Sequence, residues 1–467
     1  MSGQPLRRSL GRFQFLTIGL GAIMGVAWAI VLGHWLASAA PAGVIVGFVA
    51  GGLLMLLVAA CYGELATTLP QAGGDVTYAF ELFGSWPAFC VGWFLVLMAV
   101  SITSFEAISL AWFVSVLAPE YKGTAAYRVF GHDVEFGGLL IGITFICMIT
   151  LVNYRGVQSS SRLQDVFTIL KALAVIAFVI AAFIGGRTSN LTPIATPVLE
   201  RPAWLGALWI AATAPVWFGG FQVVPQAIEE RSAHTSLRTV ANMTVLSVAA
   251  GIVFYCVIVL ASACILPWRS LVAEPLPAVS AIRAAFHGGV GASLVLAAIA
   301  LGILATWNAC FLWATHLLLA MGRLHLAPAW LASTNAHGAP DRATLFVGAI
   351  GLAGVFLGRG GLIPIINMAS ISLALSYVVC CGATLRLRRR DPDRPRPYEV
   401  PGGLTVVRLA VGVSALMGLV ALLEPLTRAR GWPLEWTLML AWGGIGAVAW
   451  RLTRDQRRVS SSGGITD

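Results

Sequence analysis

Charged residues are scarce in this chain. Of its 467 residues, 11% are Asp, Glu, Lys or Arg and 58% are apolar, whereas a soluble domain carries about 25% charged residues. This composition excludes a soluble globular protein. Runs of about 20 apolar residues are long enough to cross a bilayer, and such runs fill most of the chain. The composition therefore predicts a polytopic membrane protein.

Cysteine motifs and catalytic patterns are also lacking. The eight cysteines all fall inside apolar runs and none has Cys-x-x-Cys spacing, which excludes the usual zinc sites and a disulfide framework. An intramembrane hydrolase would need paired aspartates, a His-Glu-x-x-His motif or a serine with a polar base deep in adjacent spans. The sequence offers no such pairing, so we expect no covalent chemistry and no cofactor or metal.

Long polar segments are absent as well. No loop or tail is much longer than about 20 residues, whereas an independent domain needs about 50. We therefore expect a single transmembrane domain over residues 1–467, with a short cytoplasmic tail at 453–467. The lack of a soluble module argues against a membrane-embedded amine sensor that signals through a partner.

The apolar runs predict an all-α protein with twelve membrane spans. Because five is an odd number, spans 1 to 5 and 6 to 10 would form repeats of opposite orientation, over about residues 12–185 and 203–384, with two peripheral helices in 404–452. The spans are expected at about 14–40, 43–69, 87–118, 136–152, 163–185, 203–227, 242–266, 289–320, 343–358, 362–384, 404–424 and 432–452.

Arginine sets the predicted topology. With twelve spans, nineteen arginines lie on the side of the two termini, and the opposite side has nine basic residues. The positive-inside rule then places both termini in the cytoplasm. The net charge of +10 is scattered along that edge rather than gathered on one face, which favours anionic lipid over nucleic acid as a partner. The excess of arginine over lysine hints at a bacterial inner membrane.

Two apolar spans are interrupted by glycine or proline at corresponding positions of the two repeats. The first reads Gly-Leu-Gly-Ala-Ile-Met-Gly over residues 19–25, and the sixth reads Pro-Val-Trp-Phe-Gly-Gly-Phe over 215–221. Unwound backbone at mid-membrane depth is tolerated only where it lines a cavity, so paired breaks indicate a transporter binding site. A glycine-rich packing face is the alternative for either one alone.

The breaks predict the substrate ligands. Amides of Gly25, Val26 and Ala27 would begin a half-helix, whose partial positive charge attracts a carboxylate, and the carbonyls before them would take an ammonium or a cation. Phe218 is predicted to be a gate, although it could instead be an ordinary core aromatic. The predicted substrate-binding residues along these two breaks are Ile23, Met24, Gly25, Val26, Ala27, Trp28, Phe218, Gly219, Gly220, Phe221 and Gln222.

Polar side chains deep in other spans are functional hypotheses, because a charge in the bilayer is costly. Glu106 in the third span could attract a cationic group, or could be a protonated residue that bonds helices together. Lys171 in the fifth span could lose its proton near neutral pH and act as a proton-coupling switch, or could extend to the cytoplasmic surface. Trp307 and Asn308 add an aromatic ring and an amide to the predicted binding site.

At these residues the chain resembles the amino acid, polyamine and organocation transporter superfamily, from about residue 12 to 401. Four motifs occur in the family's order: Tyr-Gly-Glu-Leu-Ala with Pro-Gln-Ala-Gly-Gly-Asp-Val-Thr-Tyr (62–78), Asn-Tyr-Arg-Gly-Val-Gln through Lys171 (153–171), Pro-Gln-Ala-Ile-Glu-Glu (225–230) and Arg-Pro-Tyr-Glu-Val-Pro-Gly-Gly (396–403). The resemblance implies inverted repeats, alternating access and amino acid or amine substrates.

The resemblance also implies roles for single residues. Family members hold substrate on the backbone of spans 1 and 6, gate it with an aromatic that matches Phe218, and in some cases use a lysine that matches Lys171 in place of sodium. The chain departs from the family's Gly-Ser-Gly-Ile-Phe with Gly-Val-Ala-Trp-Ala at 25–29, and from its acidic residue with Gln222. These changes are compatible with a cationic amino acid, a simple amine or a small neutral amino acid.

The sequence as a whole predicts a plasma-membrane permease that moves an amino acid or amine by alternating access. Proton symport through Lys171 is the main hypothesis for coupling. Exchange of substrates without net proton flux remains an alternative that the sequence does not separate from symport. The sequence also leaves the oligomeric state open.

Overall fold

The computed structural model describes residues 10–25, 27–70, 74–156, 161–198, 202–428 and 431–454. These residues form an almost entirely helical protein, as the composition predicts, with one short β-hairpin that the sequence did not lead us to expect. The chain folds as two compact units. Unit 1 comprises residues 1–84, 168–299 and 373–421, and unit 2 comprises 85–167, 300–372 and 422–467.

Unit 1 contains the two interrupted spans. Four of its helices, α6, α13, α15 and α16, also contribute residues to unit 2. Its helices are α1 (Arg12–Ile23), α2 (Ala27–Thr68), α3 (Gly74–Phe83), α6 (Ser161–Gly185), η2 (Thr188–Leu191), α7 (Ala203–Ala212), α8 (Ala214–Phe218), α9 (Val223–Gln226), η3 (Ile228–Glu230), α10 (Leu237–Ile265), α11 (Trp268–Ala273), α12 (Pro277–Ala285), α13 (Val290–Arg323), α15 (Leu362–Arg390) and α16 (Gly403–Leu423).

Unit 2 contains most of α13, the first part of α15 and the β-hairpin. Strands β1 and β2 pair antiparallel around a turn at Phe130 and Gly131. Its other elements are α4 (Ser85–Leu117), η1 (Pro119–Tyr121), β1 (Ala125–Val129), β2 (His132–Glu135), α5 (Phe136–Tyr154), η4 (Ala329–Ala332), α14 (Asp341–Val355), η5 (Arg359–Gly361), α17 (Pro425–Arg428) and α18 (Leu434–Leu452).

Helix α2 joins two predicted spans through a sharp kink. Ala40 has φ 55° and ψ 168°, and Pro41 follows it. Proline has no amide hydrogen to donate and disfavours helical backbone at the residue before it. The kink therefore coincides with the predicted boundary between spans 1 and 2, at residues 40–43.

Seven of the described helices are long and apolar enough to cross a membrane. The difference from twelve predicted spans has identifiable sources. The first two spans share α2, the sixth is broken into short pieces, α14 has only 15 residues, and α6 and α18 are not among the seven. A multi-pass membrane protein is thus confirmed by these helices, whereas the count of twelve stays a prediction.

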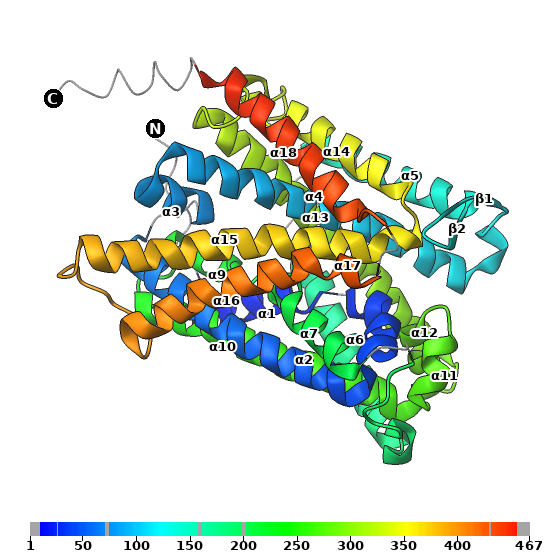
Figure 1. Cartoon of the computed structure of the whole chain (residues 1–467). Helices are drawn as coiled ribbons and strands as arrows, with labels where there is room; N and C mark the ends of the chain where they lie inside the picture. The colour runs from blue at the N-terminus through cyan, green and yellow to red at the C-terminus, as the bar shows by residue number, and fades with distance from the viewer. Residues whose placement is uncertain are drawn as a thin grey trace. The chain divides into compact units, whose positions relative to one another are not determined.

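Glycines let the helices of unit 1 approach closely. Helix α2 packs against both α10 and α7, and Figure 1 shows α2 and α10 running side by side. A Cβ added to Gly47 would lie 2.8 Å from the Ala207 carbonyl oxygen, and one added to Gly51 would lie 2.8 Å from the Ala214 Cβ. The glycines at four-residue spacing in α2 therefore form a helix-packing surface.

The buried carboxylate of Glu64 in α2 forms hydrogen bonds with α15 and with the loop before α16. Glu64 is 2% exposed. Its Oε1 accepts a hydrogen bond from Arg388 Nε at 2.6 Å, and its Oε2 accepts one from the Val400 amide at 2.7 Å. Because a buried charge needs both a partner and hydrogen bonds, Glu64 has a structural role at this end of unit 1.

The first described residue pairs with the segment that follows the sixth span. The Leu10 amide donates to the Glu230 carbonyl at 3.0 Å, and the Ser232 amide donates to the Leu10 carbonyl at 2.9 Å. Helix α1 begins two residues later. These two bonds fix where the first helix starts within unit 1.

The packing at Gly51 yields the first prediction. A Gly51→Val substitution places a side chain 3.0 Å from the Ala211 Cα, and overpacking of this kind costs about 1–3 kcal/mol. We expect the midpoint of thermal unfolding of the purified protein, followed by intrinsic fluorescence, to fall by several degrees. Gly412→Val in α16 is the matched control, because no atom lies within 4 Å of its added Cβ. Equal losses at both positions would contradict the packing role.

Candidate functional site

The first interruption separates α1 from α2. Helix α1 ends at Ile23, and the Met24 amide donates to the Leu20 carbonyl at 2.8 Å. The Gly25 amide, which the sequence analysis assigned to a substrate carboxylate, donates instead to the Ile23 carbonyl at 2.7 Å. Ala27 begins α2, and the predicted ligand Val26 lies outside the described residues.

The second interruption separates α8 from α9, where the sequence predicts an opening between Trp217 and Gln222. Helix α8 ends at Phe218, and Gly220 has φ +109°, a conformation that favours glycine. The Gln222 side chain supports this turn. Its Oε1 accepts from the Gly220 amide at 3.0 Å and from the Tyr377 hydroxyl of α15 at 3.4 Å.

The two interruptions touch. A Cβ added to Gly220 would lie 2.8 Å from the Ala22 Cβ and 3.0 Å from its carbonyl carbon. Even the smallest side chain therefore has no room at Gly220. The second interruption thus packs against the last turn of α1, about 200 residues away in the sequence, within unit 1.

Tyr255 of α10 ties the two helix ends together. Its hydroxyl, on a residue only 3% exposed, lies 2.9 Å from the Trp217 carbonyl oxygen of α8 and 3.2 Å from the Ile23 carbonyl oxygen of α1. Carbonyls in the last turn of a helix lack the usual helical amide partner. The single hydroxyl proton is shared between these two acceptors. The sequence analysis missed Tyr255, and its signal was a lone phenol in an apolar span, which needs a hydrogen-bond partner.

Lys171 also serves the end of α1. The residue is 6% exposed, and its Nζ donates to the Gly21 carbonyl at 3.2 Å. The C-terminal end of a helix carries a partial negative charge, so a cationic amine is stabilised there. The ammonium group of Lys171 therefore occupies the kind of position predicted for a cation.

The aromatic residues of the site are packed inside unit 1. Phe218 is fully buried, and its ring meets the positions where Gly52 and Gly251 would carry a Cβ, at 2.9 and 3.2 Å. Phe221 is also fully buried and lies edge-on to Tyr62, with ring centroids 5.2 Å apart. In this conformation the predicted gate Phe218 is held between α2 and α10.

Trp28, which stands where the resemblance leads one to expect an isoleucine, faces α6. Its ring stacks on Phe178 with centroids 6.1 Å apart, and the residue is 1% exposed. Within the described part of the chain, its indole N–H has no hydrogen-bond acceptor. A buried N–H without a partner costs about 1–3 kcal/mol, so this group is well suited to donate to a ligand oxygen.

Three predicted site residues belong to unit 2. Glu106 of α4 is 2% exposed, and Trp307 of α13 is fully buried. The Asn308 Oδ1 accepts from the Asn153 Nδ2 of α5 at 3.0 Å. The remaining described site residues all lie in unit 1, where the structure brings them together around the two interruptions.

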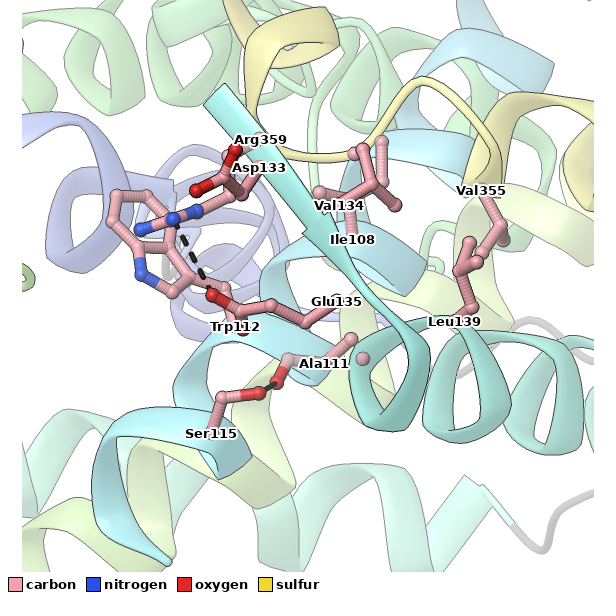
Figure 2. Close-up of a pocket in the computed structure, with 12 residues that line it drawn as sticks. Ile108, Ala111, Trp112, Ser115, Asp133, Val134, Glu135, Leu139, Val355 and Arg359 are labelled. Carbon is pink, nitrogen blue, oxygen red and sulfur yellow. Dashed lines mark hydrogen bonds and ion pairs between the residues drawn. The ribbon is translucent and has the colours of Figure 1, made fainter. Parts of the chain in front are cut away.

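Unit 2 also contains a cavity of about 40 Å³ beside the β-hairpin (Figure 2). The Glu135 carboxylate at its wall pairs with Lys122 at 3.0 Å and with Arg359 at 3.6 Å, and the Arg359 guanidinium lies 5.5 Å from the centre of the Trp112 ring. Partial burial and the nearby Arg359 lower the pKa of His132. The cavity is thus lined by charged groups of the β-hairpin and η5 and by an aromatic ring of α4.

The chain is similar to known transport proteins along nearly its full length. Residues 10–448 match the family model described as amino acid permease. A branched-chain amino acid permease of Bacillus subtilis (strain 168) is 27% identical, over 87% of this chain and 87% of its own. The methylthioribose transporter of the same organism is 26% identical, over 88% of this chain and 87% of its own. Cationic amino acid transporter 6, chloroplastic, of Arabidopsis thaliana is 25% identical, over 89% of this chain and 72% of its own.

The bridge made by Tyr255 gives a prediction about stability. Tyr255→Phe keeps the ring that stacks on Phe48 but removes the hydroxyl shared by two carbonyls. The Ile23 carbonyl would keep its bond from the Gly25 amide, whereas the Trp217 carbonyl would lose the Tyr255 donor. An unsatisfied buried acceptor costs about 1–3 kcal/mol, so we expect a lower midpoint of thermal unfolding. Tyr121→Phe, at a residue 63% exposed, should leave the midpoint unchanged. A Tyr255→Phe protein as stable as its parent would refute the bridging role.

Proposed function

The chain belongs to the amino acid permease family, and from that premise we propose that it carries an amino acid or a related amine across the membrane by alternating access. The chain is a multi-pass membrane transporter, and the relatives named above are permeases and transporters rather than enzymes. The observation that carries the proposal is the pair of helix interruptions that meet at Gly220 and Ala22 and share Tyr255.

A twelve-span fold with inverted repeats of five helices accommodates these interruptions. The first four spans of each predicted repeat fall largely in matching units, apart from the first ten residues of α13. Unit 1 takes the first two of each repeat, in α1 and α2 and in α7 to α10, and unit 2 takes the third and fourth of each, in α4 and α5 and in α13 and α14. This grouping supports a repeat architecture whose units move as bodies. Arginine asymmetry favours cytoplasmic termini in a plasma membrane.

Substrate recognition combines backbone and side chains. The helix interruptions offer polar backbone groups for the carboxylate and amine of an amino acid, and the buried indole N–H of Trp28 adds a donor. Glu106 of unit 2 is a separate candidate, whose buried carboxylate would favour a cationic side chain or amine. The names of the relatives include both branched-chain and cationic amino acids, so the choice between these classes is a matter for measurement.

The contact of Lys171 with Gly21 supports the proposal that Lys171 couples transport to protons. A protonated amine donates to this carbonyl and stabilises the negative end of α1, and a neutral amine loses the charge that makes the contact strong. Protonation of Lys171 would thereby favour one position of α1. Exchange of substrates without proton flux is the alternative. Uptake measured with and without a proton gradient separates symport from exchange.

Lys171→Ala in proteoliposomes tests the coupling. We expect an inward proton gradient to accelerate uptake by the parent protein, and the variant to lose that response while it still exchanges internal for external substrate. Lys122→Ala is the matched control, since Lys122 is the other lysine of the chain and pairs with Glu135 at the β-hairpin. A gradient response that survives in Lys171→Ala would overturn the coupling role.

Glu106→Gln tests substrate charge. The substrate is first identified by thermal stabilisation with a panel of amino acids, polyamines and small amines, because a ligand at 100 times its Kd stabilises by about 2.7 kcal/mol. We expect the variant to bind cationic compounds at least tenfold more weakly and neutral ones unchanged. Glu120→Gln, at an exposed position in η1, is the control. Equal losses for cationic and neutral ligands would assign Glu106 a structural role.

A further inference from the structure

Asp75 lies outside the proposed substrate site yet contacts the segment that leaves it. We propose that Asp75 is a positioning residue, a latch whose carboxylate holds α9 against α2 and α15 and lets it go during each transport cycle. The proposal rests on transport by alternating access. It adds a residue of α3 to the machinery that moves the sixth span.

The carboxylate of Asp75 is buried and divides its two oxygens between different elements. The residue is 2% exposed. Oδ1 accepts from the Tyr62 hydroxyl of α2 and, in α15, from the Ser376 hydroxyl at 2.8 Å and the Cys380 thiol at 3.4 Å. Oδ2 accepts from Gln226 Nε2 of α9 at 3.3 Å. Three donors hold Asp75 to α2 and α15, whereas one donor holds α9 to Asp75.

Neutral hydrogen-bond donors, rather than a cationic side chain, surround the Asp75 carboxylate. None of the ion pairs found among the described residues includes Asp75. Burying a carboxylate is costly unless hydrogen bonds compensate for lost water, and bonds to an ionised acceptor are roughly twice as strong as neutral ones. The three bonds that Oδ1 accepts from α2 and α15 therefore hold Asp75 in place. The single long bond from Gln226 to Oδ2 is the one that breaks first.

Close backbone contact reinforces the same junction. Gly74, the first residue of α3, has φ +55°, and an added Cβ would lie 2.8 Å from the Gln226 Cγ. Glycine thus permits both the backbone conformation and the approach of α9. The Gln226 side chain fits against the start of α3 with its amide directed to Asp75.

A chain of hydrogen bonds connects this junction to the second interruption. Ser376, which binds Asp75, is followed in α15 by Tyr377, which donates to Gln222 Oε1. The same Gln222 oxygen accepts the Gly220 amide at the break. Neighbouring residues of one helix therefore contact both the latch and the turn that touches Ala22. A change at the turn can reach Asp75 through α15.

A fixed role for Asp75, in which it simply anchors α3, is the competing explanation. Gln226→Glu separates the two, because it puts a second carboxylate against Oδ2 and should repel α9 while the three anchoring donors of Asp75 remain. Hydrogen–deuterium exchange of the peptide over residues 221–230 reports the opening of α9. We expect about tenfold faster exchange in the variant, equivalent to about 1.4 kcal/mol, and no change in a reference peptide over residues 251–262 of α10.

A swap of the two side-chain types is the matched control. Asp75→Asn with Gln226→Glu restores one carboxylate and one amide with their places exchanged, so exchange in the 221–230 peptide should return to within twofold of the parent rate. Gln226→Ala, which removes the bond without adding repulsion, should give a smaller increase than Gln226→Glu and serves if the latter does not fold. Additive effects in the double variant would overturn the pairing.

A moving latch must also respond to substrate. In the parent protein a saturating transported compound should change exchange in the 221–230 peptide, and Gln226→Glu should abolish that change because α9 is already released. An exchange rate that does not respond to substrate, in a protein that transports, would overturn the latch alone. Failure of the parent protein to transport any compound in proteoliposomes would instead overturn the proposed function.

Discussion

Backbone carbonyl groups at the ends of interrupted helices impose the main constraint on this protein. Inside a bilayer no water is available to them, so the protein itself must supply every donor. The Tyr255 hydroxyl donates to carbonyls at the ends of α1 and α8, and Lys171 donates to the Gly21 carbonyl in the last turn of α1. Because one phenol reaches both ends, the two interruptions must stay within about a hydrogen bond's length of the same point of α10. The contact of Gly220 with Ala22 is the geometric result.

The close packing around these ends follows from the same constraint. Helix α10 can present Tyr255 only if it lies close to α2 and α1, and the glycines at 52 and 251 leave the space into which Phe218 fits. Phe218 is fully buried there, with its ring centroid 5.7 Å from that of Tyr255. Buried aromatic rings thus lie beside the carbonyls at the helix ends in unit 1.

Local sequence signals predicted the helix interruptions, whereas the hydrogen-bond partners of the buried polar residues depend on tertiary contacts. Glycine and proline at 19–25 and 215–220 indicate where a helix cannot continue, and the breaks occur there. The partners of Tyr255 and Asp75 could not be predicted, because a hydrogen bond between residues 38 or 301 positions apart depends on packing and not on spacing. The Gly25 amide, predicted to bind a substrate carboxylate, takes part in a short local turn that the sequence did not indicate. At Ala40, by contrast, a non-helical residue followed by Pro41 separates two helical segments where the sequence placed the boundary between spans 1 and 2.

The pairing of Leu10 with Glu230 and Ser232 has a consequence for biosynthesis. Helix α1 has 12 residues and is about 18 Å long, well short of the roughly 30 Å of hydrocarbon it enters. Its start is fixed by a segment that the ribosome makes some 220 residues later. Until that segment is made, Leu10 lacks both of these hydrogen-bond partners. We therefore expect the start of the first helix to reach its final position late in assembly, although its residues are synthesised first.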